Sequence, residues 1–199
     1  MNRRSLLARS LLAMPLLLAG CGLATRPYAE RRTWPLQVRR PTSVPPRAGG
    51  RVLLVRTVRA GPGLEARGLQ AVQPDGSVKT EFYEEWAVPP AEGVEDALRQ
   101  WLADSGRFAA VVAAGSRLVP GLVLEGSLDA LWTVAASRQA HAAMGVTVIE
   151  QKGDAPRILL QRTFSADVPL ATLDAPDAAS GMRAALAQVF TRIETALPK

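Results

Sequence analysis

The side chain with the clearest chemistry in this sequence is its single thiol, Cys21. A basic start, an apolar stretch over residues 11–18 and the small pair Ala19-Gly20 stand in front of it. These three regions, in this order, make up a secretory signal with its cleavage site. The eight apolar residues would extend only about 12 Å as a helix, against about 30 Å of membrane hydrocarbon, so they cannot span a bilayer. We therefore predict that residues 1–20 are a signal peptide that is removed.

The thiol predicts a lipid attachment site. The run Leu18-Ala19-Gly20-Cys21 resembles the bacterial lipobox, whose cysteine sulfur accepts a diacylglycerol before the signal is cleaved. Two or more acyl chains anchor a protein stably, whereas one is marginal. Because residue 22 is Gly22 and not the aspartate that usually marks inner-membrane retention, we expect an outer-membrane lipoprotein that faces the periplasm. The alternative to lipidation is a free cysteine beside an ordinary secretory signal. The pair Arg3-Arg4 is compatible with the export route for folded proteins and with the general secretory route.

Basic residues are concentrated just behind this anchor. Residues 21–51 hold seven arginines and one glutamate, while residues 52–199 hold 14 basic and 17 acidic side chains. The same stretch is rich in proline, which favours an extended, semi-rigid backbone. We therefore expect a lipidated tether over residues 21–32, either solvated or held against anionic headgroups, and one domain over residues 33–199. The sequence has no stripe of arginines with stacking aromatic side chains, so it does not indicate a nucleic-acid partner.

Few side chains could carry catalysis. His141 is the only histidine, and with the only cysteine lipidated it has no thiol partner and no zinc-ligand set. Gly61-Pro62-Gly63 follows a strand pattern but lacks the lysine and the spacing of a phosphate-binding loop, which favours a plain turn. We predict no enzyme activity, no metal and no cofactor. Glu81, Glu84 and Glu85 indicate a solvated acidic strand edge, or alternatively a surface that faces a basic partner.

The elements that would position these residues follow from hydrophobic periodicity. Apolar runs between turn signals predict strands over 51–58, 69–73, 78–86, 122–132, 144–149 and 158–164, with shorter patterns at 34–38 and 108–112. Pro89-Pro90 opens one amphipathic helix, and Asp174 caps a second that runs to Leu197. We expect an α+β fold in which a single sheet of about six strands carries both helices on one face.

Three tryptophans, Trp86, Trp101 and Trp132, occur in regular apolar patterns and are expected first in the core. Trp86 could alternatively line a surface groove, because it lies near Tyr83 and Pro89-Pro90 in the sequence. Aromatic side chains are enriched at protein interfaces. The candidate partner interface therefore consists of Tyr83, Trp86, Pro89 and Pro90.

Four stretches in this order carry a resemblance to a known family. They are Gly63-Leu64, then Glu81-Phe82-Tyr83-Glu84-Glu85-Trp86-Ala87-Val88-Pro89-Pro90, then Leu98 to Leu102, then Ser105-Gly106-Arg107-Phe108-Ala109-Ala110-Val111-Val112. Together with the lipobox at Cys21, they resemble the ABC-type transport auxiliary lipoprotein component family from about residue 33 onward. The tyrosine or arginine positions that are usual in this family are here Gln70, Gln73 and Lys79, so no contact is carried over there.

The resemblance implies a non-catalytic outer-membrane subunit of an MCE-type (mammalian cell entry) ABC lipid transport system. These systems include the paraquat-inducible type. Its partners would be the periplasmic MCE-domain protein, on which it docks, and the ABC permease and ATPase of the same system. Ring-like homo-oligomers are plausible for such a family. The alternative function is a periplasmic lipid-binding module that carries acyl chains directly.

Overall fold

A computed structural model describes residues 30–151 and 155–198 of the chain. The chain forms two units, and the boundary between them follows Glu30. The fold described below is that of the second unit, which begins at Arg31. Cys21 and the predicted signal peptide lie outside the described residues.

Nine strands form one mixed sheet, so the expectation of about six strands is wrong. Four of the strands have only two to four residues, which is too few for a readable period, although the short patterns at 34–38 and 108–112 overlap two of them and the run at 51–58 overlaps a third. The strands are β1 (Arg32–Trp34), β2 (Val52–Val55), β3 (Arg59–Ala60), β4 (Gly68–Val72), β5 (Val78–Trp86), β6 (Ala110–Ala113), β7 (Leu122–Val134), β8 (Gln139–Glu150) and β9 (Arg157–Pro169).

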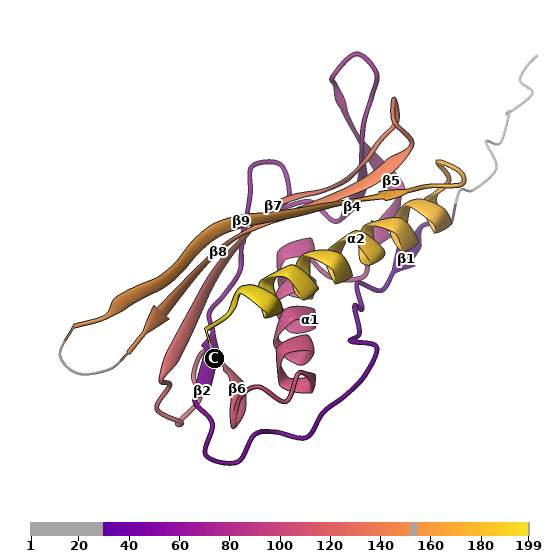
Figure 1. The fold of residues 1–199 in the computed structure, drawn as a ribbon. Helices are drawn as coiled ribbons and strands as arrows, with labels where there is room; N and C mark the ends of the chain where they lie inside the picture. Colours follow the sequence, from indigo (N-terminus) through magenta and orange to yellow (C-terminus); the bar gives the residue numbers. More distant parts are fainter. Residues whose placement is uncertain (1–29, 152–154, 199) are drawn as a thin grey trace, which may run out of the picture. The chain divides into compact units, whose positions relative to one another are not determined.

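Strand β7 is the centre of the sheet (Figure 1). Along one side it pairs antiparallel with β8, which pairs antiparallel with β9. Along its other side it pairs parallel with three successive strands, first β2, then β3, then β4. Beyond β4 follow β5 and then β1, which runs parallel to β5. The sequence around residues 31–34 is therefore attached to the sheet through β5.

Two helices complete the α+β fold and lie on the same face of the sheet (Figure 1). Helix α1 spans Pro90–Asp104 and begins directly after Pro89, whose fixed backbone suits a helix start. Helix α2 spans Ala175–Ala196, and the Asp174 side chain accepts a hydrogen bond from the Asp177 amide at 2.9 Å. Both helices occupy the ranges that the sequence predicts.

The core lies between this sheet face and the helices. Trp101 of α1 and Phe190 of α2 contact each other edge to face, with ring centroids 5.7 Å apart. Helix α2 approaches the sheet closely at Gly181, because a Cβ atom there would lie 3.0 Å from the Ala140 Cβ and 2.2 Å from the Leu170 Cδ2. Buried side chains of both helices and of the sheet form one hydrophobic core.

Candidate functional site

The first strand of the unit is held on the sheet by charged side chains. Arg32 donates to the Glu84 carboxylate, with its Nε 2.7 Å from Oε1, and Trp34 Nε1 donates to the other oxygen at 2.8 Å. The Glu84 side chain is only 15% exposed. Because the Arg32 and Glu84 backbones are register partners in the β1–β5 pair, the side chains meet directly. Glu84 therefore fixes the start of the domain.

The neighbouring carboxylate has the same kind of role. Glu85 is 9% exposed and lies 2.9 Å from Arg67 and 3.8 Å from Arg31. A carboxylate this far from water is retained in proteins when it is paired and hydrogen-bonded. Glu81, in contrast, pairs with Lys79 on the same strand at the surface. The acidic strand thus has basic partners within its own domain, two of them from the arginine-rich segment before it.

Two aromatic side chains stand exposed on β5. Phe82 is 67% exposed and Tyr83 is 47% exposed, and their rings contact each other edge to face with centroids 5.0 Å apart. The Arg31 guanidinium lies 4.8 Å from the Phe82 ring centroid, a cation–π contact. We name Arg31, Phe82 and Tyr83 the aromatic patch. Exposed aromatic side chains beside arginine are the composition that marks binding surfaces.

The residues of the predicted interface divide between surface and core. Tyr83 is exposed, Pro89 is half-buried, and Trp86 and Pro90 are buried, with Trp86 only 1% exposed. Trp86 is the last residue of β5, while Phe82 shares its strand face and lies four residues nearer the β4–β5 hairpin, which projects from the sheet in Figure 1. Sequence reasoning missed Phe82 because strand periodicity shows which residues share a face, not where the covering helix stops.

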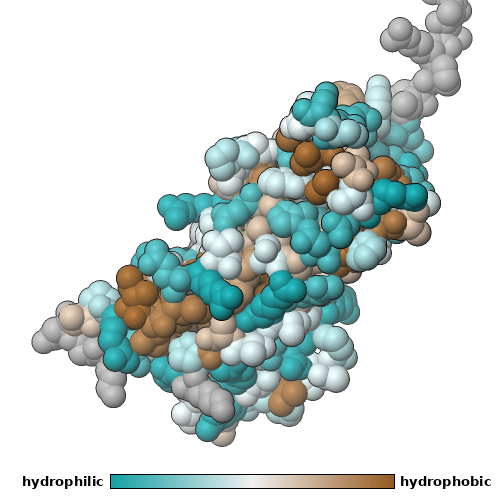
Figure 2. All heavy atoms as spheres, turned by 45° about the horizontal axis from the view of Figure 1, so that its top comes forward, coloured by the Kyte–Doolittle hydropathy of each residue, from teal (hydrophilic) through white to brown (hydrophobic). Residues whose placement is uncertain are grey.

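A second apolar surface lies at the end of the β8–β9 hairpin, where Figure 2 shows hydrophobic side chains gathered. Ile158 at the start of β9 is 60% exposed. The loop before β7 reaches the same end of the sheet, because the Gln151 amide donates to the Gly121 carbonyl at 3.1 Å. In that loop Leu118 is 51% and Val119 is 88% exposed. Strand periodicity in the sequence does not show that these three apolar side chains are exposed.

Among the described residues, the side chains considered for catalysis are not gathered with the partners that catalysis would require. His141 Nδ1 lies 2.7 Å from an Asp167 oxygen on the open face of the sheet, and its ring centroid is 6.0 Å from that of Trp132. Within residues 30–151 and 155–198, no group of three or more histidine, cysteine or carboxylate side chains could hold a metal ion. Every buried side-chain nitrogen or oxygen in that part of the chain has a hydrogen-bond partner.

The glycine-rich turn between β3 and β4 is built from backbone contacts. The Gly61 amide donates to the Leu128 carbonyl at 2.8 Å, and Gly63 has a φ of +80°, which favours glycine. The side chain of Gln70 donates to the Gly63 carbonyl. These contacts attach the turn to β7 and β4, as a structural turn requires.

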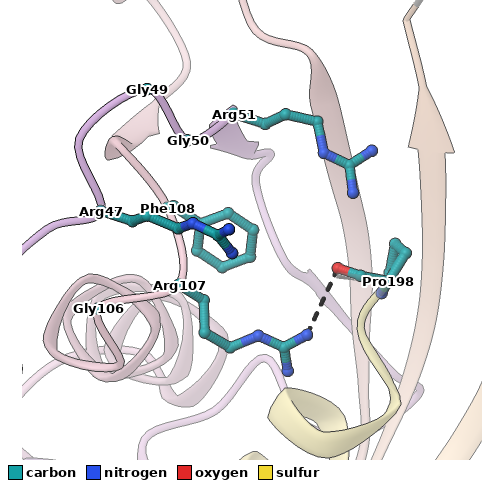
Figure 3. Close-up of a pocket in the computed structure, with 8 residues that line it drawn as sticks. All are labelled: Arg47, Gly49, Gly50, Arg51, Gly106, Arg107, Phe108 and Pro198. Atoms are coloured by element: carbon teal, nitrogen blue, oxygen red, sulfur yellow. Dashed lines mark hydrogen bonds between the residues drawn. The ribbon is translucent and has the colours of Figure 1, made fainter.

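A pocket of about 350 Å³ lies at the C-terminal end of α2 and has a basic lining (Figure 3). Arg107 donates to the carbonyl oxygen of Leu197 at 2.7 Å and to that of Pro198 at 3.4 Å, and also to the Glu194 carbonyl. The last carbonyl groups of a helix have no partner within the helix, and a cation stabilises that negative end. Arg107 therefore holds the end of α2. The other arginines of the pocket are Arg47 and Arg51.

Neither described helix has the length together with the apolar content that crossing a membrane would require, within the part of the chain that the structure describes.

Comparisons with known proteins agree with this fold. Residues 35–194 match the family model described as ABC-type transport auxiliary lipoprotein component. No curated protein matches the sequence. Protein XCC0632 from Xanthomonas campestris, assigned to DUF330, is similar in structure with a TM-score of 0.67 and 21% identity, covering 81% of this chain and 92% of that one. The hypothetical protein CT253 from Chlamydia trachomatis has a TM-score of 0.52 and 12% identity, covering 73% and 96%. At these identities, the likeness concerns the fold alone.

Proposed function

The chain belongs to the ABC-type transport auxiliary lipoprotein component family, and from this membership we propose that it is a non-catalytic, lipid-anchored subunit of an MCE-type lipid transport system. The family consists of auxiliary transport components, is not a known enzyme class, and as a lipoprotein family is associated with membranes. In this proposal the acyl chains on Cys21 hold the protein in the outer membrane. The domain docks on the periplasmic MCE component, which works with an ABC permease and ATPase.

The observation that carries the docking role is the aromatic patch. Phe82 and Tyr83 expose two rings on a strand whose other end is fixed by the buried Trp86. Exposed aromatics on a rigid element bind partners well, because little side-chain entropy is lost on contact. Arg31 brings a positive charge to the same surface. A contact here would involve the predicted residue Tyr83 and would leave the core undisturbed.

The anchor limits where this patch can act. Ten residues lead from Cys21 to Arg31, and an extended proline-containing linker covers about 3.1 Å per residue, or about 30 Å in all. Arg31 and Arg32 contact Glu85 and Glu84, so they contribute to the domain rather than to the free tether. The domain would therefore work within about 30 Å of its bilayer, and a partner would have to extend to it.

A second candidate function is direct lipid binding by the domain. It is favoured by an open groove of about 560 Å³ beside α1, a volume within the range of ligand sites. Native mass spectrometry of the purified lipoprotein distinguishes the two functions. Bound phospholipid beyond the covalent anchor supports the module, whereas its absence supports docking. The same spectra give the oligomer number, which tests the homo-oligomeric ring.

Crosslinking in intact membranes tests the docking role. We expect the MCE component to crosslink to the parent protein, and Cys21→Ser to leave the membrane fraction and lose both crosslinking and palmitate labelling. If no lipid-transport component is crosslinked to the parent, the docking role fails. If Cys21→Ser stays in the membrane and functions as the parent does, the anchor is wrong.

A further inference from the structure

The segment that follows β1 has the burial alternation of a strand but is not paired into the sheet that the described residues form. Leu36 and Val38 are 6% and 5% exposed, while Gln37 and Arg39 between them are exposed, which is the alternation of a half-buried strand. Within residues 30–151 and 155–198, however, the backbone groups of residues 36–39 make no hydrogen bond. An extended segment with unpaired amide and carbonyl groups is a template on which another strand can pair.

This segment is held in place at both ends. The Trp34 carbonyl accepts from the Ala87 amide at 2.8 Å, and the Val44 amide donates to the Asp104 carbonyl at 2.9 Å. Between these points it packs tightly on α1, because a Cβ atom at Gly93 would lie 3.1 Å from the Leu36 Cβ. The segment is thus preformed, and a partner would lose little entropy in ordering it.

A groove runs between this segment and α1. Its volume is about 560 Å³, and residues 35–39 form one wall while α1 forms the other. The α1 wall carries Asp96 and Asp104, and the segment carries Arg39, so the charged side chains of the groove leave it net negative. Asp96 is 72% exposed, which makes its carboxylate available to a cation in the groove despite its contact with Arg99 on the same helix.

We propose that this groove binds an extended segment of a partner protein, which pairs as a strand with residues 36–39 and directs cationic side chains toward Asp96 and Asp104. Strand addition takes its affinity from backbone hydrogen bonds and its specificity from alternate side chains. Here residues 36–39 supply the backbone groups, and the α1 wall supplies the surface that the side chains contact. The inference rests on the proposed docking role, since a partner protein supplies the strand.

The chemistry of the groove favours a peptide over a lipid. An acyl chain laid along residues 36–39 would cover their amide and carbonyl groups without pairing them, and an unpaired polar group removed from water is costly. The two carboxylates would also repel the phosphate of a lipid headgroup. A basic strand satisfies both features, because it pairs the backbone and neutralises the charge.

Amide hydrogen exchange on the full-length lipoprotein in detergent tests this binding. The probe is a capped hexapeptide of alternating valine and lysine, and its control is the same peptide with glutamate in place of lysine. We expect the lysine peptide to slow exchange at least tenfold at alternate amides among residues 36–39, since only one strand edge faces the groove. No protection by the lysine peptide, equal protection by the glutamate peptide, or protection by added phosphatidylglycerol instead would each overturn the proposal.

A double variant, Asp96→Asn with Asp104→Asn, tests the charge. It should weaken binding of the lysine peptide about five- to tenfold, a loss that fits one exposed and one half-buried charge contact. Glu92→Gln is the matched control, because it removes an exposed carboxylate of α1 outside the groove, and it should bind like the parent. If the double variant binds the peptide as the parent does, the carboxylates do not recognise the strand and the proposal fails.

Membrane crosslinking separates this inference from the docking role. The double variant should crosslink to the transport partner at reduced yield. If its yield equals that of a parent that does crosslink, the groove inference is wrong while the docking role stands. Failure of the docking role is judged on the parent protein alone, whereas the groove is judged on the peptide and on the double variant.

Discussion

Trp101 of α1 donates its indole N–H to the carboxylate of Glu194 on α2, with Nε1 2.8 Å from Oε2. The same carboxylate accepts two bonds from Arg40, at 3.1 Å and 3.2 Å, so it joins both helices to the segment that follows β1. The Glu194 and Arg40 side chains are 15% and 19% exposed. One side chain thus connects three parts of the chain that lie far apart in the sequence.

The first prediction concerns this connection. Glu194→Ala should lower the free energy of unfolding by about 2 kcal/mol, because it leaves the Trp101 indole and the Arg40 guanidinium without their acceptor in a largely buried place. Urea denaturation measures the change. Glu92→Ala, an exposed carboxylate of α1, should stay within about 0.5 kcal/mol of the parent. Equal effects of the two variants would show that the Glu194 contacts contribute nothing.

The second prediction concerns the irregular pairing of β4 and β5 at Gly68. A Cβ atom there would lie 2.3 Å from the Glu81 carbonyl oxygen, and this oxygen belongs to the backbone, so it cannot rotate away. Gly68→Ala should therefore cost about 2 kcal/mol in urea denaturation. Gly121→Ala is the control, because its nearest neighbours would lie 3.7 Å away, an ordinary contact distance. A Gly68→Ala protein as stable as the Gly121→Ala protein would contradict the geometry.

The third prediction concerns the aromatic patch. Phe82→Ala and Tyr83→Ala should each leave the free energy of unfolding within about 0.5 kcal/mol, since both rings are largely exposed. Each should reduce membrane crosslinking to the transport partner about fivefold or more, as truncation of an aromatic anchor does at an interface. Leu173→Ala is the control, because Leu173 is 48% exposed and lies outside the patch. Unchanged crosslinking in both aromatic variants would place the contact elsewhere.

The fourth prediction concerns the turn between β4 and β5. Hydrogen bonds from the Ser77 hydroxyl and the Ser77 amide lower the pKa of Asp75 below its usual value. A lowered folded pKa means that this contribution to stability is present above the unfolded pKa and is lost as the pH falls through the folded pKa. Ser77→Ala removes the larger cause and should raise the pKa of Asp75 toward the usual aspartate range. NMR titration of the carboxyl resonance measures it, and an unchanged midpoint would contradict the assignment.

Both helices could be predicted because their signals are local. Pro89-Pro90 and Asp174 mark the two starts, and the apolar residues behind them recur at helical spacing. The long strands could be predicted only in part. Strand β8 begins at Gln139, five residues before the predicted start, because its alanine-rich beginning has little strand propensity and is held by β7 and β9 on either side.

The site was less predictable than the fold, because its contacts join distant residues. Arg32 and Glu84 are separated by 52 positions, and only the parallel pairing of β1 with β5 brings them together. The unpaired segment has the alternation of a strand in the sequence, at Leu36 and Val38, but the sequence cannot show that no neighbour pairs with it. Charge and periodicity do not show which residues pair, and they predict a solvated acidic edge where Glu84 and Glu85 are largely buried.

The attachment of β1 has a mechanical consequence. Because β1 is the first strand of the unit, tension applied to the chain ahead of Arg31 loads the three-residue β1–β5 pairing before it reaches any helix. The contacts of Glu84 and Glu85 with Arg32 and Arg31 resist that load at the same place. Stretching would peel this strand away first and uncover Trp34, while the packed helices keep their shape.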